Sequence, residues 1–435
     1  MGKALLGIVA DDITGSSDIG VLIAKWNYTV KIFSYDTIDD LYDVDSDVII
    51  IDTNSRFDKK NDAYEKARKA TRKLKELGCT QFYNKTCSVF RGNIGVEFDA
   101  MQDELGINSS IVVLGYPETG RTTMNSIHYV YGEPLSKSMF RNDPIHPMQQ
   151  DNLIDILQEQ TVKRVGAISN TLIRKGTDIL KREIESMKND YNYVILDVES
   201  DESLETIADA IKNFPIICGS AVMGKYLPKY WPRKEKIDHL KGLDLEEDVG
   251  TFIPCGSLMP QMKKQIDYIV EKGDAVNLTL NSEILFTSKQ YKAEIERVSQ
   301  QCIQLLKKGT NVILRTPYSS ERIKATRENG YKYMRLNEVE SSERVSEALA
   351  EISYNVVNEL NLKKIITCGG NTSNAICKKL GIHGVCIVDE IDQGVSSCIS
   401  LNEKPIFLIL KSGSFGKEDF LQQSLQYLEQ CQRGV

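Results

Sequence analysis

The sequence has little of what marks a metal-binding, disulfide-bonded or membrane protein. Its four histidines are far apart and none of its ten cysteines forms a C-x-x-C pair, so a zinc site is not expected. Cysteines scattered singly are typical of reduced, buried thiols, which points to the cytosol. No apolar run approaches the roughly 18 residues that span a bilayer, so we expect a cytoplasmic protein with no membrane partner.

The chain also lacks an excess of positive charge and a dinucleotide fingerprint. Its 54 basic and 61 acidic residues give a formal charge of −7, which argues against nucleic acid as a partner. No G-x-G-x-x-G follows an apolar run, which counts against a nicotinamide dehydrogenase. Gly219 to Lys225 nearly matches a phosphate loop, but Tyr226 stands where a magnesium-binding hydroxyl belongs. We interpret that segment as a close crossing of a strand and a helix.

Two α/β domains are what the remaining sequence predicts. The 435 residues suffice for two domains, with 41% hydrophobic and 26% charged residues, as in globular proteins. Strand-like apolar runs alternate with helical segments, the pattern of a mostly parallel sheet flanked by helices. Residues 226–250 carry two prolines and dense charge and are interpreted as a linker. The predicted domains are therefore 1–225 and 251–435.

Polar residues gather at the ends of the N-terminal strands. The run from Leu5 to Ala10 ends in Asp11 and Asp12, and an apolar helix is expected from Ile19 to Trp26. Ligands bind at the carboxyl ends of parallel strands, and two adjacent carboxylates need a cation or a hydrogen-bonding substrate. Solvated turn acids, one of them a helix cap, are the alternative interpretation.

Basic and hydroxyl side chains follow the later N-terminal strands. They are Arg56, Lys85, Ser88, Arg91 and Arg121, the last in a predicted turn over residues 116–123. Arginine forks match carboxylates bidentately, whereas ordinary surface ion pairs contribute little. The recurrence of polar residues at successive strand ends favours a site for a small polyhydroxylated carboxylic acid.

Three glycine-containing turns follow strands of the C-terminal half. They are Gly256-Ser257, Gly369 to Ser373, and Ser412 to Ser414. Glycine lets the backbone approach an anion closely, and a helix N-terminus offers unpaired N–H groups. Each turn alone is commonplace, but three at one sheet edge would cradle a di- or triphosphate.

The order of these motifs resembles the four-carbon acid sugar kinase family over nearly the whole chain. The matching stretches are Ala10 to Gly15, Ser55-Arg56, Lys85 to Asn93, Pro117 to Thr122, Gly256-Ser257 with Gln261 or Gln265, Gly369 to Ser373, and Lys411 to Gly416. The resemblance implies an ATP-dependent kinase that phosphorylates a hydroxyl of a tetronate or oxo-tetronate. It also implies an acid-binding N-terminal domain, an ATP-binding C-terminal domain, and an active site in the interdomain cleft.

Individual roles follow from the resemblance and from the strand-end residues. Asp12 is expected to orient or deprotonate the acceptor hydroxyl, with Asp11 as the alternate, while Arg56 and Arg91 hold the carboxylate. The expected acid-binding residues are Asp11, Asp12, Arg56, Lys85, Thr86, Cys87, Ser88 and Arg91. The expected ATP-binding residues are Ser257, Gly369, Gly370, Asn371, Thr372 and Gly413. Mg²⁺ is expected to bridge the phosphates, with no protein ligand assigned.

Two positions depart from the family pattern. Cys87 and Asn371 stand where the family has aspartates. The first change removes an expected partner of a substrate hydroxyl, and the second removes a carboxylate near the phosphates. A kinase for a different sugar acid, or a non-catalytic ligand-binding or regulatory relative, is therefore the alternative. A homodimer is the default expectation for oligomeric state.

Overall fold

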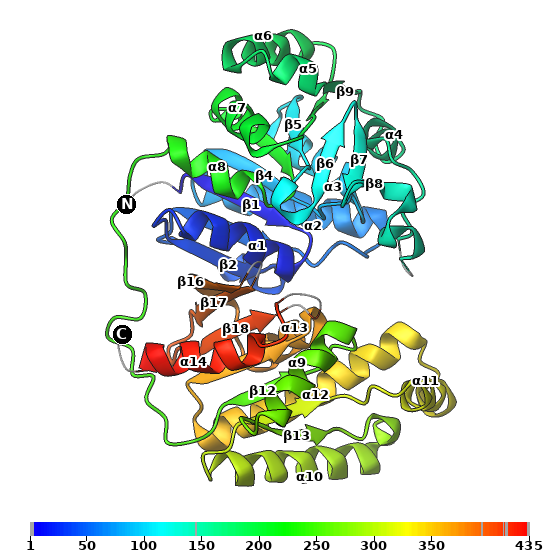
Figure 1. The fold of residues 1–435 in the computed structure, drawn as a ribbon, viewed down its shortest axis with the longest axis vertical. Coiled ribbons are helices and arrows are strands. Elements are labelled where there is room, and N and C mark those ends of the chain that lie inside the picture. The colour runs from blue at the N-terminus through cyan, green and yellow to red at the C-terminus, as the bar shows by residue number, and fades with distance from the viewer. Residues whose placement is uncertain (1–3, 144–145, 393–394, 412, 414–415, 433–435) are drawn as a thin grey trace. The chain divides into compact units, whose positions relative to one another are not determined.

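A computed structural model describes residues 4–143, 146–392, 395–411, 413 and 416–432. The chain divides into two compact units, Met1–Ile237 and Asp238–Val435, which are called unit 1 and unit 2. Each unit is built on a mostly parallel sheet flanked by helices (Figure 1). The predicted α/β class with two such units is therefore confirmed.

The main sheet of unit 1 is parallel throughout. Its order is β2-β3-β1-β4-β11-β5-β10-β9. The strands are β1 (Leu6–Ala10), β2 (Val30–Ser34), β3 (Val48–Asp52), β4 (Gln81–Lys85), β5 (Ser110–Val113), β9 (Val165–Ile168), β10 (Tyr193–Leu196) and β11 (Ile216–Gly219). β1, β3 and β10 are buried along their whole length, because helices cover both faces of such a sheet.

The helices of unit 1 connect these strands. They are α1 (Ile13–Ala24), α2 (Lys60–Glu76), α3 (Ile94–Leu105), α4 (Leu153–Gln158), α5 (Asn170–Ile173), α6 (Thr177–Met187), α7 (Asp201–Ile211) and α8 (Met223–Tyr226). α1 begins six residues before the predicted start at Ile19. Its first turn forms because the Asp12 side chain accepts a hydrogen bond from the Gly15 N–H at 2.7 Å and so satisfies a free donor.

A small antiparallel sheet in unit 1 replaces part of the turn predicted over residues 116–123. It consists of β6 (Arg121–Met124), β7 (Ile127–Val130) and β8 (Glu133–Pro134). Asn125 and Ser126 connect β6 to β7 with φ of 51° and 64°, the paired positive values of a tight hairpin turn. A bridge between Thr123 and Val198 ties this hairpin to the segment after β10.

The near-match to a phosphate loop is a place of close packing, as predicted. Gly219 has φ of 138°, and a Cβ there would lie 1.9 Å from the Val113 carbonyl oxygen. A Cβ on Gly224 would lie 2.9 Å from Ile19 Cγ1 of α1. Only glycine allows β11 and α8 to approach their neighbours this closely.

The sheet of unit 2 is parallel from β13 to β18 and ends in an antiparallel pair. Its order is β13-β14-β12-β15-β18-β17-β16. The strands are β12 (Phe252–Cys255), β13 (Val276–Thr279), β14 (Val312–Arg315), β15 (Lys364–Cys368), β16 (Gly384–Asp392), β17 (Val395–Ser400) and β18 (Phe407–Lys411). The helices are α9 (Pro260–Glu271), α10 (Ser288–Leu306), α11 (Ser320–Met334), α12 (Glu338–Leu360), α13 (Gly370–Lys379) and α14 (Phe420–Gln432). Within the described ranges, no helix is both long and apolar enough to cross a membrane.

Candidate functional site

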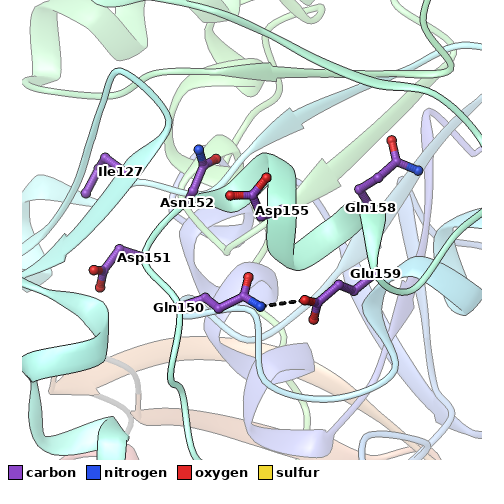
Figure 2. A pocket seen from close by; sticks show the side chains of 7 residues that line it. All are labelled: Ile127, Gln150, Asp151, Asn152, Asp155, Gln158 and Glu159. Carbon is purple, nitrogen blue, oxygen red and sulfur yellow. Dashed lines mark hydrogen bonds between the residues drawn. The ribbon is translucent and has the colours of Figure 1, made fainter.

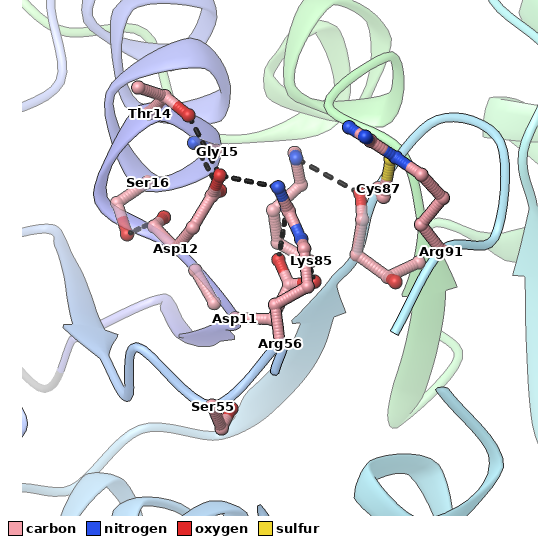
Figure 3. A network of polar contacts seen from close by, with 12 residues as sticks. Asp11, Asp12, Thr14, Gly15, Ser16, Ser55, Arg56, Lys85, Cys87 and Arg91 are labelled. Atoms are coloured by element: carbon pink, nitrogen blue, oxygen red, sulfur yellow. Dashed lines mark hydrogen bonds and ion pairs between the residues drawn. The ribbon is translucent and has the colours of Figure 1, made fainter. Parts of the chain in front are cut away.

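The carboxyl ends of β1, β3 and β4 bring the predicted acidic and basic residues together in unit 1. Ala10 is in register with Asp52 on one side and with Lys85 on the other. The Asp11 N–H donates to the Lys85 carbonyl at 3.3 Å. Three neighbouring strand ends therefore supply the side chains of one cluster, shown in part in Figure 3.

Arg56 is held by both carboxylates at the end of β1. Its Nε and Nη2 each lie 2.7 Å from an oxygen of Asp11, and its Nη1 lies 2.5 Å from Asp12 Oδ2 (Figure 3). The side chain of Arg56 is 11% exposed, that of Asp11 2% and that of Asp12 22%. The bidentate fork is a strong, directional contact, so the positive charge of Arg56 is already balanced within the protein.

Asp12 is the ionised and accessible member of the acid pair. Burial alone would raise its pKa, but Arg56 and Lys85, with hydrogen bonds from Thr14 and Gly15, lower the pKa below its ordinary value. Burial raises the pKa of Asp11 in spite of Arg56. A partly exposed carboxylate can accept a hydrogen bond from a substrate hydroxyl, whereas Asp11 is enclosed.

Asp52 is a further acid of this cluster that the predicted site omitted. Its side chain is buried and accepts a hydrogen bond from the Asn54 N–H at 3.0 Å. Burial, reinforced by the negative charge of Asp12, raises the pKa of Asp52 to about 7. Its sequence signal is a carboxylate at the very end of an apolar strand, the same signal that marks Asp11.

The segment from Lys85 to Arg91 begins at the end of β4, beside this cluster, and is called the acceptor loop after the role expected from the sequence. Lys85 Nζ donates to the Thr86 carbonyl at 3.0 Å. The Thr86 hydroxyl is buried and has no hydrogen-bond partner among the described residues. An unpaired buried hydroxyl is costly, and a hydroxylated ligand would supply the missing partner.

Cys87 occupies a positively charged position in the acceptor loop. Arg91 Nε donates to its sulfur at 3.4 Å, and Arg91 Nη1 pairs with Asp143 at 2.5 Å. Burial opposes ionisation of the thiol, but Arg56 and Arg91 outweigh it and lower the pKa of Cys87. The residue that replaces the family's aspartate therefore lies where negative charge is favoured.

His128 on β7 fixes the acceptor loop to the small sheet. The histidine is buried, with Nε2 3.0 Å from the Ser88 carbonyl and Nδ1 3.1 Å from Thr123 Oγ1. Burial lowers its pKa to about 4, so the ring is neutral. Because a carbonyl only accepts, Nε2 carries the proton and Nδ1 accepts from Thr123. The sequence reasoning missed this residue, because a lone histidine carries no motif.

The three predicted glycine turns meet in unit 2. A Cβ on Gly256 would lie 2.0 Å from Thr372 Oγ1, and one on Gly413 would lie 1.9 Å from Ser257 Oγ. Gly369 has φ of 116°, and its Cβ would lie 3.2 Å from the Ser257 nitrogen. These contacts join the ends of β12, β15 and β18, which are neighbours in the sheet, into one narrow backbone cradle. We call this arrangement the glycine cradle.

The N-terminus of α13 forms one side of the glycine cradle. The helix begins at Gly370, with Asn371 exposed and Thr372 buried. Gln261 and Gln265 of α9 donate to the Gly416 carbonyl at 2.8 and 3.0 Å, so both candidates for the family's glutamine contact the same turn. Ser412, Ser414 and Phe415 lie outside the described residues.

The glycine cradle and α13 fit a polyphosphate, because backbone N–H groups and a helix N-terminus favour anions. Among the described residues, no group of three or more His, Cys, Asp or Glu side chains could hold a metal ion. Mg²⁺ is commonly bound through substrate phosphates and water, with few protein ligands, so the donor set fits a nucleotide-bound ion. The exposed Asn371 offers an amide oxygen there.

A separate pocket of about 770 Å³ lies beside α4 and β7 in unit 1 (Figure 2). It is lined by Ile127, Gln150, Asp151, Asn152, Asp155, Gln158 and Glu159. Gln150 donates to Glu159 at 2.5 Å, and Asp151 accepts two bonds from Ser136. This acidic lining is unsuited to an anionic substrate, and no predicted site residue belongs to it.

Comparison with known proteins defines the class of each half. Residues 6–227 match the family model of a sugar-binding N-terminal domain, and residues 252–421 match that of a nucleotide-binding C-terminal domain. The acidic cluster lies in the first region and the glycine cradle in the second. The fold and the two sites thus define a protein with a sugar-binding N-terminal domain and a nucleotide-binding C-terminal domain.

Full-length relatives narrow the class to a family. The chain is 30% identical to the 3-oxo-tetronate kinase of Haemophilus influenzae, over 96% of this chain and 98% of that protein. It is 28% identical to that of Pseudomonas savastanoi pv. phaseolicola, over 98% of each. The chain belongs to the four-carbon acid sugar kinase family.

Solved structures show the same fold. A crystal structure of a Haemophilus influenzae protein, 28% identical, matches with a TM-score of 0.77 over 97% of this chain and all of that one (100%). A structure from Salmonella typhimurium, 23% identical, matches with a TM-score of 0.83 over 97% and 99%. The arrangement of strands and helices within the chain is thus that of known proteins.

Proposed function

We propose that this protein transfers the γ-phosphoryl group of ATP to a hydroxyl of a small sugar acid of about four carbons, such as a tetronate or oxo-tetronate. The observation that carries the proposal is the ionised, partly exposed carboxylate of Asp12, at the head of α1 beside Arg56 and Lys85. The glycine cradle of unit 2 supports it as a place for the phosphates, and the relatives named 3-oxo-tetronate kinase support the substrate class.

Asp12 is the proposed catalytic residue. The acceptor hydroxyl oxygen forms a bond to the γ-phosphorus, the bond from that phosphorus to the β-bridging oxygen breaks, ADP leaves, and the hydroxyl proton passes to Asp12. A carboxylate with a lowered pKa is a weak base, so it orients the hydroxyl first and takes the proton late. That order suits the loose transition state of phosphoryl transfer, in which positioning matters more than deprotonation.

The remaining predicted residues take supporting roles in this proposal. Lys85, Thr86, Cys87 and Ser88 of the acceptor loop contact the hydroxyls of the acid, while Arg56 fixes Asp11 and Asp12. Ser257, Gly369, Gly370, Asn371, Thr372 and Gly413 bind the phosphates of ATP through backbone N–H groups and hydroxyls. Mg²⁺ bound to the phosphates would neutralise their charge.

Substitution of Asp12 tests the proposal directly. Purified protein is incubated with Mg²⁺-ATP and a panel of four- to six-carbon sugar acids while ADP release is measured. Asp12→Asn should abolish transfer and leave ATP binding intact by calorimetry, because unit 2 is unchanged. Asp45→Asn, which removes an exposed carboxylate of unit 1, is the matched control and should keep full activity.

Two results would contradict the proposal. Undiminished turnover in Asp12→Asn would remove this residue from the reaction. If no acid in the panel supports ADP release by the wild type while some raise its melting temperature, the protein is a ligand-binding relative. The replacement of family aspartates by Cys87 and Asn371 is the observation that favours this second candidate.

A further inference from the structure

The three arginines in and near the acceptor loop differ in which groups balance their positive charge. Arg56 is bound by Asp11 and Asp12, and Arg91 is paired with Asp143 at 2.5 Å. Arg121, at the start of β6, forms no ion pair with any carboxylate of the described residues. A cationic side chain in a partly buried place without a counter-charge is unusual.

The Arg121 guanidinium is nevertheless fixed in place. Its Nη1 donates to the Thr119 carbonyl and to the Tyr131 hydroxyl. Its central carbon lies 5.2 Å from the centre of the Tyr131 ring and 6.0 Å from that of Phe140. Its Nε is buried and has no hydrogen-bond partner in the part of the chain that the structure describes. A preorganised fork with an unused donor suits an incoming oxyanion.

Arg121 lies against the acceptor loop. Arg91, the last residue of that loop, stacks on the same Phe140 ring at 5.2 Å. The hairpin that carries Arg121 is fixed to the loop by the bond from His128 Nε2 to the Ser88 carbonyl. Burial is the main cause of the lowered pKa of His128, and the charge of Arg121 also lowers it. Arg91 and Arg121 thus lie near the same aromatic ring beside the loop, and of the two only Arg91 has a carboxylate partner among the described residues.

We propose that Arg121 binds the carboxylate of the acceptor, through the free Nε–H and the outer edge of its guanidinium. The proposal rests on the proposed function, and it transfers carboxylate recognition from Arg56 and Arg91, whose charges are balanced, to Arg121. Arg121 then selects sugar acids over neutral sugars of the same length, while Asp12 acts on a hydroxyl. Its contribution is to binding and specificity rather than to the chemical step.

Binding without nucleotide provides the test. Calorimetric titrations use a tetronate, the neutral four-carbon polyol erythritol, and butyrate, which has a carboxylate but no hydroxyls. Arg121→Gln should weaken tetronate binding roughly 10- to 100-fold, the effect of losing a charge-assisted hydrogen bond. Binding of erythritol should not change. In turnover assays KM should rise with kcat little changed, as for a uniform binding contact.

Two further variants serve as controls. Arg121→Lys keeps the charge but loses the fork and should weaken tetronate binding less than Arg121→Gln, which separates recognition from misfolding. Arg141→Gln removes an exposed arginine of the same unit and should bind tetronate like the wild type. Butyrate could bind the wild type as tightly as the tetronate does and fail to bind Arg121→Gln. In that case Arg121 recognises a carboxylate without the hydroxyls of an acceptor, as in another metabolite, and the proposal that Arg121 binds the acceptor is overturned.

The outcomes separate this inference from the proposed function. Unchanged tetronate affinity in Arg121→Gln, or an equal loss for erythritol, overturns the role of Arg121 and leaves the kinase intact. Tetronate binding that depends on Arg121 without any ADP release supports the inference and contradicts the kinase. A wild type that binds no sugar acid overturns both.

Discussion

Replacing Asp52 by asparagine should stabilise unit 1 increasingly as the pH rises. The Asp52 side chain is 5% exposed at the end of β3 and lies close to the charges of Asp11 and Asp12. Burial and Asp12 raise its pKa from 3.8 to about 7. Asparagine has the shape of the protonated acid but cannot ionise, so it removes this one titration.

The sign and the size follow from linkage between protonation and folding. In the unfolded chain Asp52 loses its proton near pH 3.8, whereas in the folded chain it keeps the proton to about pH 7. The bound proton therefore favours the folded state fully below pH 3.8, and this stability is lost as the pH rises through about 7. At about 1.4 kcal/mol per pKa unit, the total loss is about 4 kcal/mol. About 2.5 kcal/mol of it falls between pH 5 and pH 8.

Urea unfolding followed by tryptophan fluorescence measures this loss in unit 1. The chain has two tryptophans, Trp26 and Trp231, and both lie within Met1–Ile237, so the signal reports on that unit. The free energy of unfolding of Asp52→Asn, minus that of the wild type, should increase by about 2.5 kcal/mol from pH 5 to pH 8. Asp45→Asn, at an exposed position of the same unit, should show no such increase.

Two results would refute this reasoning. An equal stabilisation at pH 5 and pH 8 would mean that Asp52→Asn acts through packing and not through a proton. Destabilisation at pH 8 would mean that a cation stabilises the ionised carboxylate of Asp52 in the folded state. In the second case the pKa of Asp52 would lie below its ordinary value of 3.8 instead of near 7.

Three further substitutions test other parts of the two units. Gly413→Ala should weaken ATP binding roughly 10-fold or more without affecting tetronate binding, because its Cβ would lie 1.9 Å from Ser257 Oγ. Glu403→Ala, at an exposed position of unit 2, is the calorimetric control. Equal ATP affinities of Gly413→Ala and the wild type would contradict the role of the glycine cradle. In the wild type, unit 1 should lose about 3 kcal/mol of stability as the pH falls from 6.5 to about 4, because the buried His128 ring stays neutral while the unfolded one takes a proton. His128→Gln should not show this loss. Matching pH profiles of tryptophan-monitored unfolding for the two proteins would rule this out. Cys87→Asp should raise kcat/KM for a four-carbon acid roughly 10-fold, whereas Cys87→Ser should not. Lower turnover in the aspartate variant would show that the thiol is the better partner of the substrate hydroxyl.

Much of the fold could be predicted because the central strands are locally marked. The apolar run from Leu5 to Ala10 forms β1 (Leu6–Ala10), which ends at the predicted residue. It is a short run that must be buried on both faces, so its composition alone separates it from the polar loop that follows. The hairpin of β6 and β7 has no such signal. Three of the four residues from Arg121 to Met124 are polar and only Thr123 is buried, so the strand pairs because of its turn and its bridge to Val198.

The residues of the candidate site could be predicted from the sequence, but their contacts could not. Asp11, Asp12, Arg56, Lys85 and the glycine turns could be named from the sequence because each follows an apolar strand, and the parallel sheet then brings them to one edge of their unit. The partners of each charge could not be named. Arg56 meets Asp11 from 45 positions away, and His128 meets Ser88 from 40 positions away.

The sequence by itself determined which residues end the strands, and so the family, the two classes of turn and the identity of the charged groups. Only the tertiary structure decided their states: that Asp12 is ionised, that Asp52 titrates near 7, and that Arg121 has no carboxylate partner among the described residues. The physical reason is the distance along the chain over which each interaction acts. Strand and turn propensities arise from neighbours along the chain, whereas desolvation and Coulomb interactions depend on groups that only folding brings within a few ångströms.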